Sequence, residues 1–237
     1  MRLDKFLSET ATASRSEANK AARGGRILVN GYACKDASCH IDPDKDEIVY
    51  CGEKVVYKKY VYVMLNKPEG YVSATEDGRD KTVLELLPEK LRNMSLFPCG
   101  RLDKNTTGLM LLTNNGELGH KLLAPKSHVS KTYRFKAMEA LSDEDVEKLQ
   151  GGVYIAGGYL TKPATIKLYD SQTEGEITIV EGKYHQIKYM FEAVKNKITE
   201  LERISFGPLK KDESLLLGEW RYLTEDEEKA LVEHCKK

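Results

Sequence analysis

The stretch Cys99–Thr113, CGRLDKNTTGLMLLT, joins a charged loop to an apolar strand. It places Arg101 and Asp103 on a short segment that is bounded by glycines and rich in hydroxyl side chains, and it continues into the apolar run Leu109–Leu112. Charged side chains on a loop that a rigid strand holds are typical of a catalytic or binding site. From the spacing alone, Asp103 is equally well explained as a turn residue whose carboxylate accepts hydrogen bonds from nearby backbone N–H groups.

This stretch resembles the catalytic signature of the RNA pseudouridine synthases, in the branch of that family that modifies ribosomal RNA. The matching residues are Gly100-Arg101-Leu102-Asp103 and Thr106-Thr107-Gly108-Leu109. In that family the aspartate is the essential residue, so the resemblance implies a catalytic role for Asp103. By family position it also implies that Arg101 is a wedge or a phosphate clamp at the place that the flipped base vacates.

Two later motifs resemble the same family. Lys131-Thr132-Tyr133 begins a predicted strand, where a tyrosine on its own is best explained as half-buried packing. The resemblance implies instead that Tyr133 lies against the target base. The segment 181–191, EGKYHQIKYMF, leads from a strand into a helix, and the family has a basic residue here that pairs with the catalytic aspartate. We therefore expect Lys188, which could also be a solvated helical lysine, to pair with Asp103 and to favour its charged form.

The N-terminal segment combines two short helices, a strand and a tight turn. Ser14 and Glu17 predict a capping box for the second helix, and Asn30-Gly31 predicts a hairpin turn because both residues tolerate positive φ. A basic helix face alone is most simply a solvated surface, but the whole pattern resembles the S4 RNA-binding domain. That resemblance implies salt-sensitive contacts to RNA phosphates. The residues assigned to these contacts are Arg2, Lys5, Arg15, Lys20, Arg23 and Arg26.

The composition of the chain changes near Lys58, where a charged connector gives way to longer strands and capped helices. We expect an S4-like RNA-binding domain at 1–58 and a catalytic domain at 59–237. Strands and helices without regular alternation predict an α+β fold whose sheet is mixed, mainly antiparallel and flanked by helices.

Several local elements of the second domain follow from the sequence. Turns are predicted at 66–70 and 114–116, and a helix is predicted from Thr82 to Leu87, with Pro88 ending it. A capped acidic helix that begins at Thr224 is expected to form a solvated lid on the sheet.

Charge and cysteine content narrow the class of protein. Lys plus Arg and Asp plus Glu both number 37, which argues against a uniformly basic nucleic-acid binder. The first 35 residues nevertheless hold seven basic and three acidic side chains, which predicts an anionic partner at this end. Five scattered cysteines are typical of reduced thiols in the cytoplasm, and Cys34, Cys39, His40 and Cys51 fit no standard zinc spacing, so no metal is expected. The sequence has no membrane-spanning run and no signal-peptide pattern.

The resemblance implies the isomerisation of uridine to pseudouridine, with the target base flipped into a pocket. The reaction needs neither a redox change nor an energy source, and the sequence has no phosphate loop or dinucleotide fingerprint, so no cofactor is expected. The segment YHQIK and the N-terminal MRLDKF are most similar to the small-subunit branch of the family. This implies 16S rRNA, at the 516-type site, as the substrate, either naked or in an assembling small ribosomal subunit. We expect the protein to act as a monomer.

Three alternatives stay open from the sequence. The substrate could be 23S rRNA, since related enzymes of the family differ in few residues. A non-catalytic S4-containing assembly factor would keep the fold, although the joint presence of Asp103, Tyr133 and Lys188 argues against it. A carboxylate glycosidase would need a second acid, for which Asp77 or Glu117 could be nominated, but neither lies in a comparable motif.

Overall fold

The computed structural model describes residues 1–236 of the chain. The backbone contacts divide the chain into two compact units. The first consists of Met1–Val61 together with Leu87–Leu96, and the second consists of Tyr62–Leu86 together with the chain from Phe97 onward.

The first unit packs two helices against a small antiparallel sheet with the strand order β2-β1-β3-β4. The predicted capping box of the second helix is present, since the Ser14 hydroxyl accepts from the backbone N–H of Glu17 and the Glu17 carboxylate accepts from that of Ser14. The predicted Asn30-Gly31 turn joins β1 to β2, with both residues at positive φ. The elements are α1 (Leu3–Glu9), α2 (Arg15–Arg23), β1 (Ile27–Val29), β2 (Tyr32–Ala33), β3 (Ile48–Tyr50) and β4 (Glu53–Val55), with a short helix α3 (Glu89–Arg92) in the later segment.

Small side chains let α2 approach α1 and the sheet closely. Ala18, Ala21 and Ala22 are completely buried, together with Leu3 and Phe6 of α1. This apolar face turns the remaining side of α2 to solvent.

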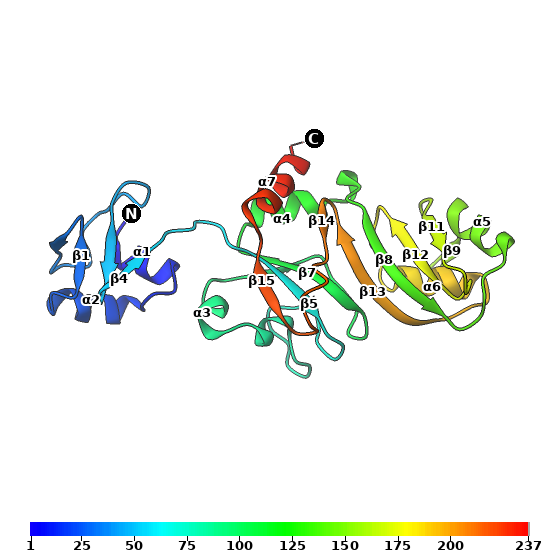
Figure 1. Ribbon diagram of the computed structural model, residues 1–237, viewed down its shortest axis with the longest axis horizontal. Coiled ribbons are helices and arrows are strands. Elements are labelled where there is room, and N and C mark those ends of the chain that lie inside the picture. The colour runs from blue at the N-terminus through cyan, green and yellow to red at the C-terminus, as the bar shows by residue number, and fades with distance from the viewer. Residues whose placement is uncertain (237) are drawn as a thin grey trace. The chain divides into compact units, whose positions relative to one another are not determined.

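The second unit is built on one large sheet with the strand order β11-β12-β8-β13-β7-β5-β15, to which β6 and β14 add at β7 and β13 (Figure 1). The strands β13 and β7 run parallel, whereas the other neighbours in this sheet are antiparallel, as the mixed sheet of the sequence prediction requires. The strands are β5 (Tyr62–Lys67), β6 (Phe97–Cys99), β7 (Thr107–Thr113), β8 (Lys131–Ala137), β9 (Tyr154–Ile155), β10 (Tyr159–Leu160), β11 (Thr165–Leu168), β12 (Glu174–Ile179), β13 (Ile198–Phe206), β14 (Leu209–Lys210) and β15 (Trp220–Tyr222).

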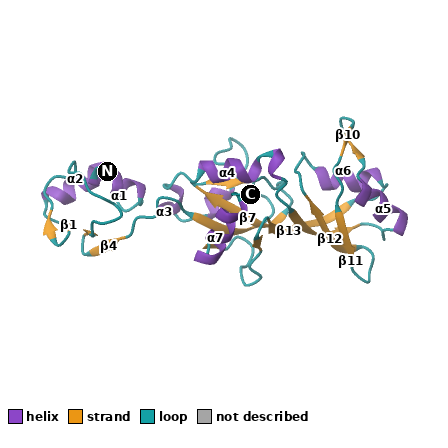
Figure 2. Ribbon diagram, turned by 90° about the horizontal axis from the view of Figure 1, so that it is seen from above, coloured by secondary structure: helices purple, strands orange, loops and turns teal. Residues whose placement is uncertain are grey.

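Helices flank this sheet. They are α4 (Gly116–Leu123), α5 (Asp143–Gly151), α6 (Gln186–Ala193) and α7 (Glu225–His234), with short 3-10 turns η1 (Val83–Leu86) and η2 (Pro125–Ser127). Figure 2 shows α5 and α6 on the same side of β11 and β12, and the edge-to-face contact of Phe135 with Phe191, at 4.9 Å, fixes α6 to β8.

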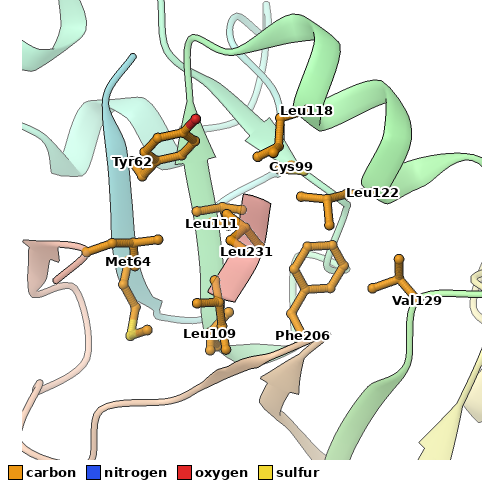
Figure 3. Packing of buried hydrophobic residues seen from close by; sticks show 12 residues of the cluster. Tyr62, Met64, Cys99, Leu109, Leu111, Leu118, Leu122, Val129, Phe206 and Leu231 are labelled. Atoms are coloured by element: carbon orange, nitrogen blue, oxygen red, sulfur yellow. The ribbon is translucent and has the colours of Figure 1, made fainter. Parts of the chain in front are cut away.

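The main core lies where β5, β7 and β13 are covered by α4 and α7 (Figure 3). Leu109 and Leu111 of β7 are completely buried against Phe206, and Leu118 of α4 joins the same cluster. The fully buried Leu231 of α7 also belongs to it, so the acidic C-terminal helix is part of the core rather than the solvated lid that the sequence suggested.

Two local predictions were wrong. The helix expected from Thr82 to Leu87 is only the 3-10 turn η1, and Pro88 is the N-cap of α3 instead of the end of a helix. Proline suits the start of a helix because its missing N–H has no partner there in any case. The plain turn expected at 114–116 is the start of α4, whose N-cap Asn115 accepts from the backbone N–H of Leu118.

Candidate active site

The loop that carries Asp103 lies between β6 and β7 and is held at its backbone. The ammonium of Lys67, at the end of β5, donates to the carbonyl oxygens of Asp103 at 3.0 Å, Lys104 at 3.3 Å and Thr106 at 2.8 Å. On the other side, the Ser73 hydroxyl donates to the carbonyl of Leu102 and accepts from its N–H. The position of the Asp103 carboxylate is thus set by contacts to segments about thirty residues earlier in the chain.

Lys67 is completely buried, which is unusual for a lysine. Burial lowers the pKa of its ammonium to about 8, against the attraction of Asp103 and Glu69. The ammonium is tolerated because its protons are shared among backbone carbonyl oxygens, the role that water plays at the surface. The loop and the lysine therefore depend on each other.

The far end of the loop is joined to β13 through a glycine. Gly108 lies opposite Arg203 at a φ of +100°, and a Cβ atom there would come within 2.4 Å of the Arg203 carbonyl oxygen. The guanidinium of Arg203 is itself buried, where its Nε donates to the carbonyl of Leu109 at 2.7 Å and its planar group lies over the Phe206 ring. Only glycine permits this close approach of the two parallel strands.

The predicted pair of Asp103 and Lys188 is present. The Nζ of Lys188 lies 2.9 Å from Oδ2 of Asp103 and also donates to Oδ1 of Asn105, with the Lys188 and Asp103 side chains 21% and 25% exposed. The Nε2 of His185 lies 3.6 Å from the other oxygen, Oδ1. Within residues 1–236, Oδ1 accepts no hydrogen bond, so it faces the site with its lone pairs available.

Lys188 comes from the first turn of α6, and a partly buried hydrogen-bond network fixes this turn. The Glu181 carboxylate accepts from the Tyr159 hydroxyl at 2.7 Å, from the backbone N–H of Lys162 at 2.9 Å and from the Gln186 amide at 2.9 Å. The Gln186 side chain in turn accepts from the backbone N–H of Lys183. The β9–β10 hairpin is thereby tied to the start of the helix that supplies the cation.

Tyr133 lies on the face of the sheet from which Lys188 reaches Asp103. Its side chain is buried, and it is two residues before Phe135, which packs on α6, so both side chains point to the same face. In register, Tyr133 is opposite Arg203, which is opposite Gly108 at the end of the Asp103 loop. Two strand spacings, roughly 10 Å, separate the backbones of Tyr133 and Gly108.

The remaining predicted residues do not join this cluster directly. Arg101 is exposed on the loop and forms no ion pair or hydrogen bond with any residue of the described chain. In the first unit, Arg2 pairs with Asp4 at 2.7 Å and Lys5 with Glu9 at 3.6 Å. The other four basic residues are exposed and have no ion-pair partner among residues 1–236, and these are Arg15, Lys20, Arg23 and Arg26.

Three residues of the site were missed from the sequence. His185 and Asn105 flank the pair of Asp103 and Lys188, and Lys67 lies beneath the loop. Their positions depend on contacts between distant segments. Two of the three could have been found from the sequence, because His185 is three residues from Lys188 and Asn105 is two residues from Asp103.

A family model described as RNA pseudouridylate synthase matches residues 61–193, and one described as S4 domain matches residues 1–48. The chain belongs to the RNA pseudouridylate synthase family. The resemblance stated from the sequence is thereby confirmed, including the S4 domain that precedes the synthase domain. The protein is an isomerase that acts on RNA.

Pseudouridine synthases of similar length match almost the whole length of the chain. The chain is 48% identical to the uncharacterized RNA pseudouridine synthase YtzG of Bacillus subtilis, with 96% of each chain covered. It is 38% identical to ribosomal small subunit pseudouridine synthase A of Escherichia coli K12, with 98% of this chain and 100% of the relative covered. A crystal structure of a pseudouridylate synthase, 37% identical, superposes with a TM-score of 0.69 over 98% of this chain and 99% of the other.

The structure also bears on two further expectations. No helix within residues 1–236 is long and apolar enough to cross a membrane. In the same part of the chain no three His, Cys, Asp or Glu side chains gather as metal ligands, although the Cys34 and Cys39 thiols lie 3.2 Å apart.

Proposed function

We propose that this pseudouridine synthase converts one uridine of 16S rRNA, at the 516-type site, to pseudouridine. The observation that carries the catalytic part is the pair of Asp103 and Lys188, with one carboxylate oxygen held by the cation and the other facing the site. The choice of RNA is supported by relatives named for the small ribosomal subunit that match almost the whole chain.

The reaction detaches the uracil base from its ribose, turns it and rejoins it to the same ribose. The bond between C1′ of the ribose and N1 of uracil breaks, and a bond between C1′ and C5 forms. C5 then loses its proton and N1 gains one, so no electrons are gained or lost. We propose that the base is flipped out of its stack to reach the site. Arg101, exposed on the loop, enters the vacated position or clamps a phosphate there.

Asp103 acts as the nucleophile on the sugar or base, or as the general base at the ribose. In each of these roles the carboxylate is held in place by the neighbouring ammonium of Lys188, which lies 2.9 Å from Oδ2. Tyr133 lies across the sheet at the level of the loop, where its ring stacks on the turned uracil and its hydroxyl takes the C5 proton late in the reaction while passing its own proton to water. No cofactor takes part in this proposal.

In this proposal the S4 domain binds the RNA. We propose that residues 1–58 act as this domain, that residues 59–237 act as the catalytic domain, and that a monomer binds either free 16S rRNA or an assembling small subunit. The unpaired basic side chains of the first unit face solvent and are suited to phosphates.

The experiment is a map of pseudouridine by carbodiimide modification and primer extension in 16S and 23S transcripts and partial particles. Wild-type protein is compared with Asp103→Asn and with Asp170→Asn, which removes an exposed carboxylate elsewhere. We expect one stop in 16S RNA that Asp170→Asn retains and Asp103→Asn abolishes, with RNA affinity kept within a few fold. A stop in 23S RNA would overturn the choice of target, and turnover by Asp103→Asn would overturn the mechanism.

A further inference from the structure

The rings of Tyr184 and His185 form a stacked pair beside Asp103. Their centroids are 3.8 Å apart and their planes differ by 16°, so the two neighbouring side chains lie almost parallel. Neighbouring side chains in an extended segment point to opposite sides, and the stack is possible because His185 has a left-handed backbone with φ of +50°. His185 in turn lies 3.6 Å from the Asp103 carboxylate. The column of rings therefore ends at the catalytic aspartate.

The outer face of Tyr184 is open. The residue is 70% exposed, whereas Gln186 and Ile187, two and three positions later, are buried, and its hydroxyl has no hydrogen-bond partner within residues 1–236. One ring face is covered by His185, which holds the tyrosine in a fixed orientation. An exposed ring of this kind contributes little to the folded state, because its contact area is left in water.

The surroundings of this face are basic. Lys183 precedes Tyr184 on the same loop and is exposed, with its ammonium over the Tyr159 ring at 4.3 Å, and Lys188 lies one helical turn further on. A fixed aromatic face with cations beside it matches single-stranded nucleic acid, in which bases stack and phosphates carry negative charge.

We propose that the outer face of Tyr184 stacks on a nucleobase of the RNA next to the flipped uridine. The inference rests on the proposed function, because it needs a uridine turned into the site of Asp103. Flipping leaves the neighbouring base without its stacking partner, and Tyr184 replaces that partner at a point fixed relative to the carboxylate. His185 is the positioning residue that holds the ring.

The test uses a fragment of whichever rRNA the wild-type protein modifies, with 2-aminopurine placed directly 5′ or 3′ of the target uridine. Stacking on the tyrosine quenches this probe, so its fluorescence in the complex reports the contact independently of turnover. The variants are Tyr184→Ala, Tyr184→Leu and Tyr184→Phe in the full chain, and KM and kcat are measured for each. The control is Tyr154→Ala, which removes a tyrosine of nearly equal exposure, 69%, on β9.

We expect one of the two probes to brighten severalfold with Tyr184→Ala and Tyr184→Leu. KM should rise about tenfold, as loss of one base–aromatic stack predicts, with a smaller change in kcat. Tyr184→Phe, which keeps the ring, and Tyr154→Ala should stay within twofold of wild type.

Unchanged fluorescence and KM in Tyr184→Ala, with normal turnover, would overturn the stacking site while the proposed function stands. A loss of kcat without any change in fluorescence would also overturn it, because the ring would then act on the reacting base. If the wild-type protein modifies no rRNA, the proposed function fails and the stacking site fails with it.

Discussion

The ammonium of Lys67 donates a 3.0 Å hydrogen bond to the backbone carbonyl of Asp103. The same ammonium reaches the carbonyl oxygens of Lys104 and Thr106, so one buried cation holds most of the loop that carries the Asp103 carboxylate. The side chain of Asp103 is left free for Lys188 and for the substrate. Backbone and side chain of the same residue are thus held by two different lysines.

Replacing Lys67 by methionine should damage both stability and activity. Several carbonyl oxygens, of which that of Thr106 is buried, would lose their donor, and we expect the free energy of unfolding to fall by on the order of 3 kcal/mol. Turnover should fall further than RNA affinity, because the loop would lose its fixed shape. Urea unfolding and single-turnover rates measure the two effects. Lys126→Met, at an exposed position, is the control. Equal stabilities and rates of the two variants would show that the hydrogen bonds of Lys67 do not hold the loop.

Replacing Gly108 by alanine should destabilise the protein by roughly 3 kcal/mol, since the new Cβ would clash with the Arg203 backbone at a φ that alanine resists. Gly78→Ala is the matched control, because a Cβ there has no heavy atom within 4 Å and no positive φ. It should change the stability by less than about 0.5 kcal/mol. Thermal unfolding of both variants gives the comparison, and a stable Gly108→Ala would show that the two strands can move apart.

Replacing Lys188 by methionine should lower the single-turnover rate roughly 10- to 100-fold, because the carboxylate of Asp103 would lose its cation. Lys188→Arg keeps the charge and should recover part of the rate. The substitution of an exposed lysine on the segment after α6, Lys197→Met, should leave the rate unchanged. A rate for Lys188→Met equal to wild type would separate this lysine from the chemistry.

The basic side chains of the first unit should contribute unequally to RNA binding. Replacing the four unpaired residues by glutamine should make the negative slope of log K against log salt shallower by about 3, since each neutralises up to one phosphate. These residues are Arg15, Lys20, Arg23 and Arg26. Lys5→Gln should have a smaller effect, because Lys5 is paired with Glu9. Filter binding over a salt series measures the slopes, and an unchanged slope would mean that α2 presents only a solvated face.

The stabilisation of the fold by the ion pairs of the C-terminal helix should depend on pH in the acid range. Arg221 pairs with Asp212 at 2.6 Å and with Glu227 of α7 at 2.7 Å. Hydrogen bonds from Ser214 and then Arg221 lower the pKa of Asp212 to about 2, and those from Arg221 lower the pKa of Glu227. Both pKa values are lower in the folded state, so the stabilisation is present above about pH 4.5 and is lost as the pH falls toward 2.

Arg221→Met should therefore be less stable than wild type at pH 7 and should lose less stability between pH 5 and pH 3. Urea unfolding at several pH values checks this, with Arg92→Met, at an exposed position, as the control. Parallel stability curves for Arg221→Met and wild type would show that this arginine does not set the acid response.

Local signals in the sequence were sufficient for much of the fold. The capping box of Ser14 and Glu17 and the hairpin at Asn30-Gly31 depend on residues a few positions apart, and both are present. The start of α4 was missed although Asn115 is a good N-cap, because Asn114-Asn115-Gly116 is also good turn chemistry.

The residues of the site also divide into those that the sequence predicted and those that it could not predict. Asp103 and Lys188 were paired through family resemblance, and the structure brings them together. The burial of Lys67 could not be read from its neighbours in the chain, since it depends on carbonyl oxygens 36 to 39 residues later. The contact of His185 with Asp103 likewise depends on how α6 returns to the loop.

The parallel pairing of β7 with β13 also bears on the order in which parts of the chain can fold during synthesis. Gly108 pairs with Arg203, and Leu65 of β5 pairs with Trp220, so the strands around the Asp103 loop need partners that are made about 95 to 155 residues later in the chain. The N-terminal unit needs no such late partners for its own sheet and can fold while the rest of the chain is still on the ribosome. An incomplete nascent chain therefore has its RNA-binding end before it has its catalytic centre.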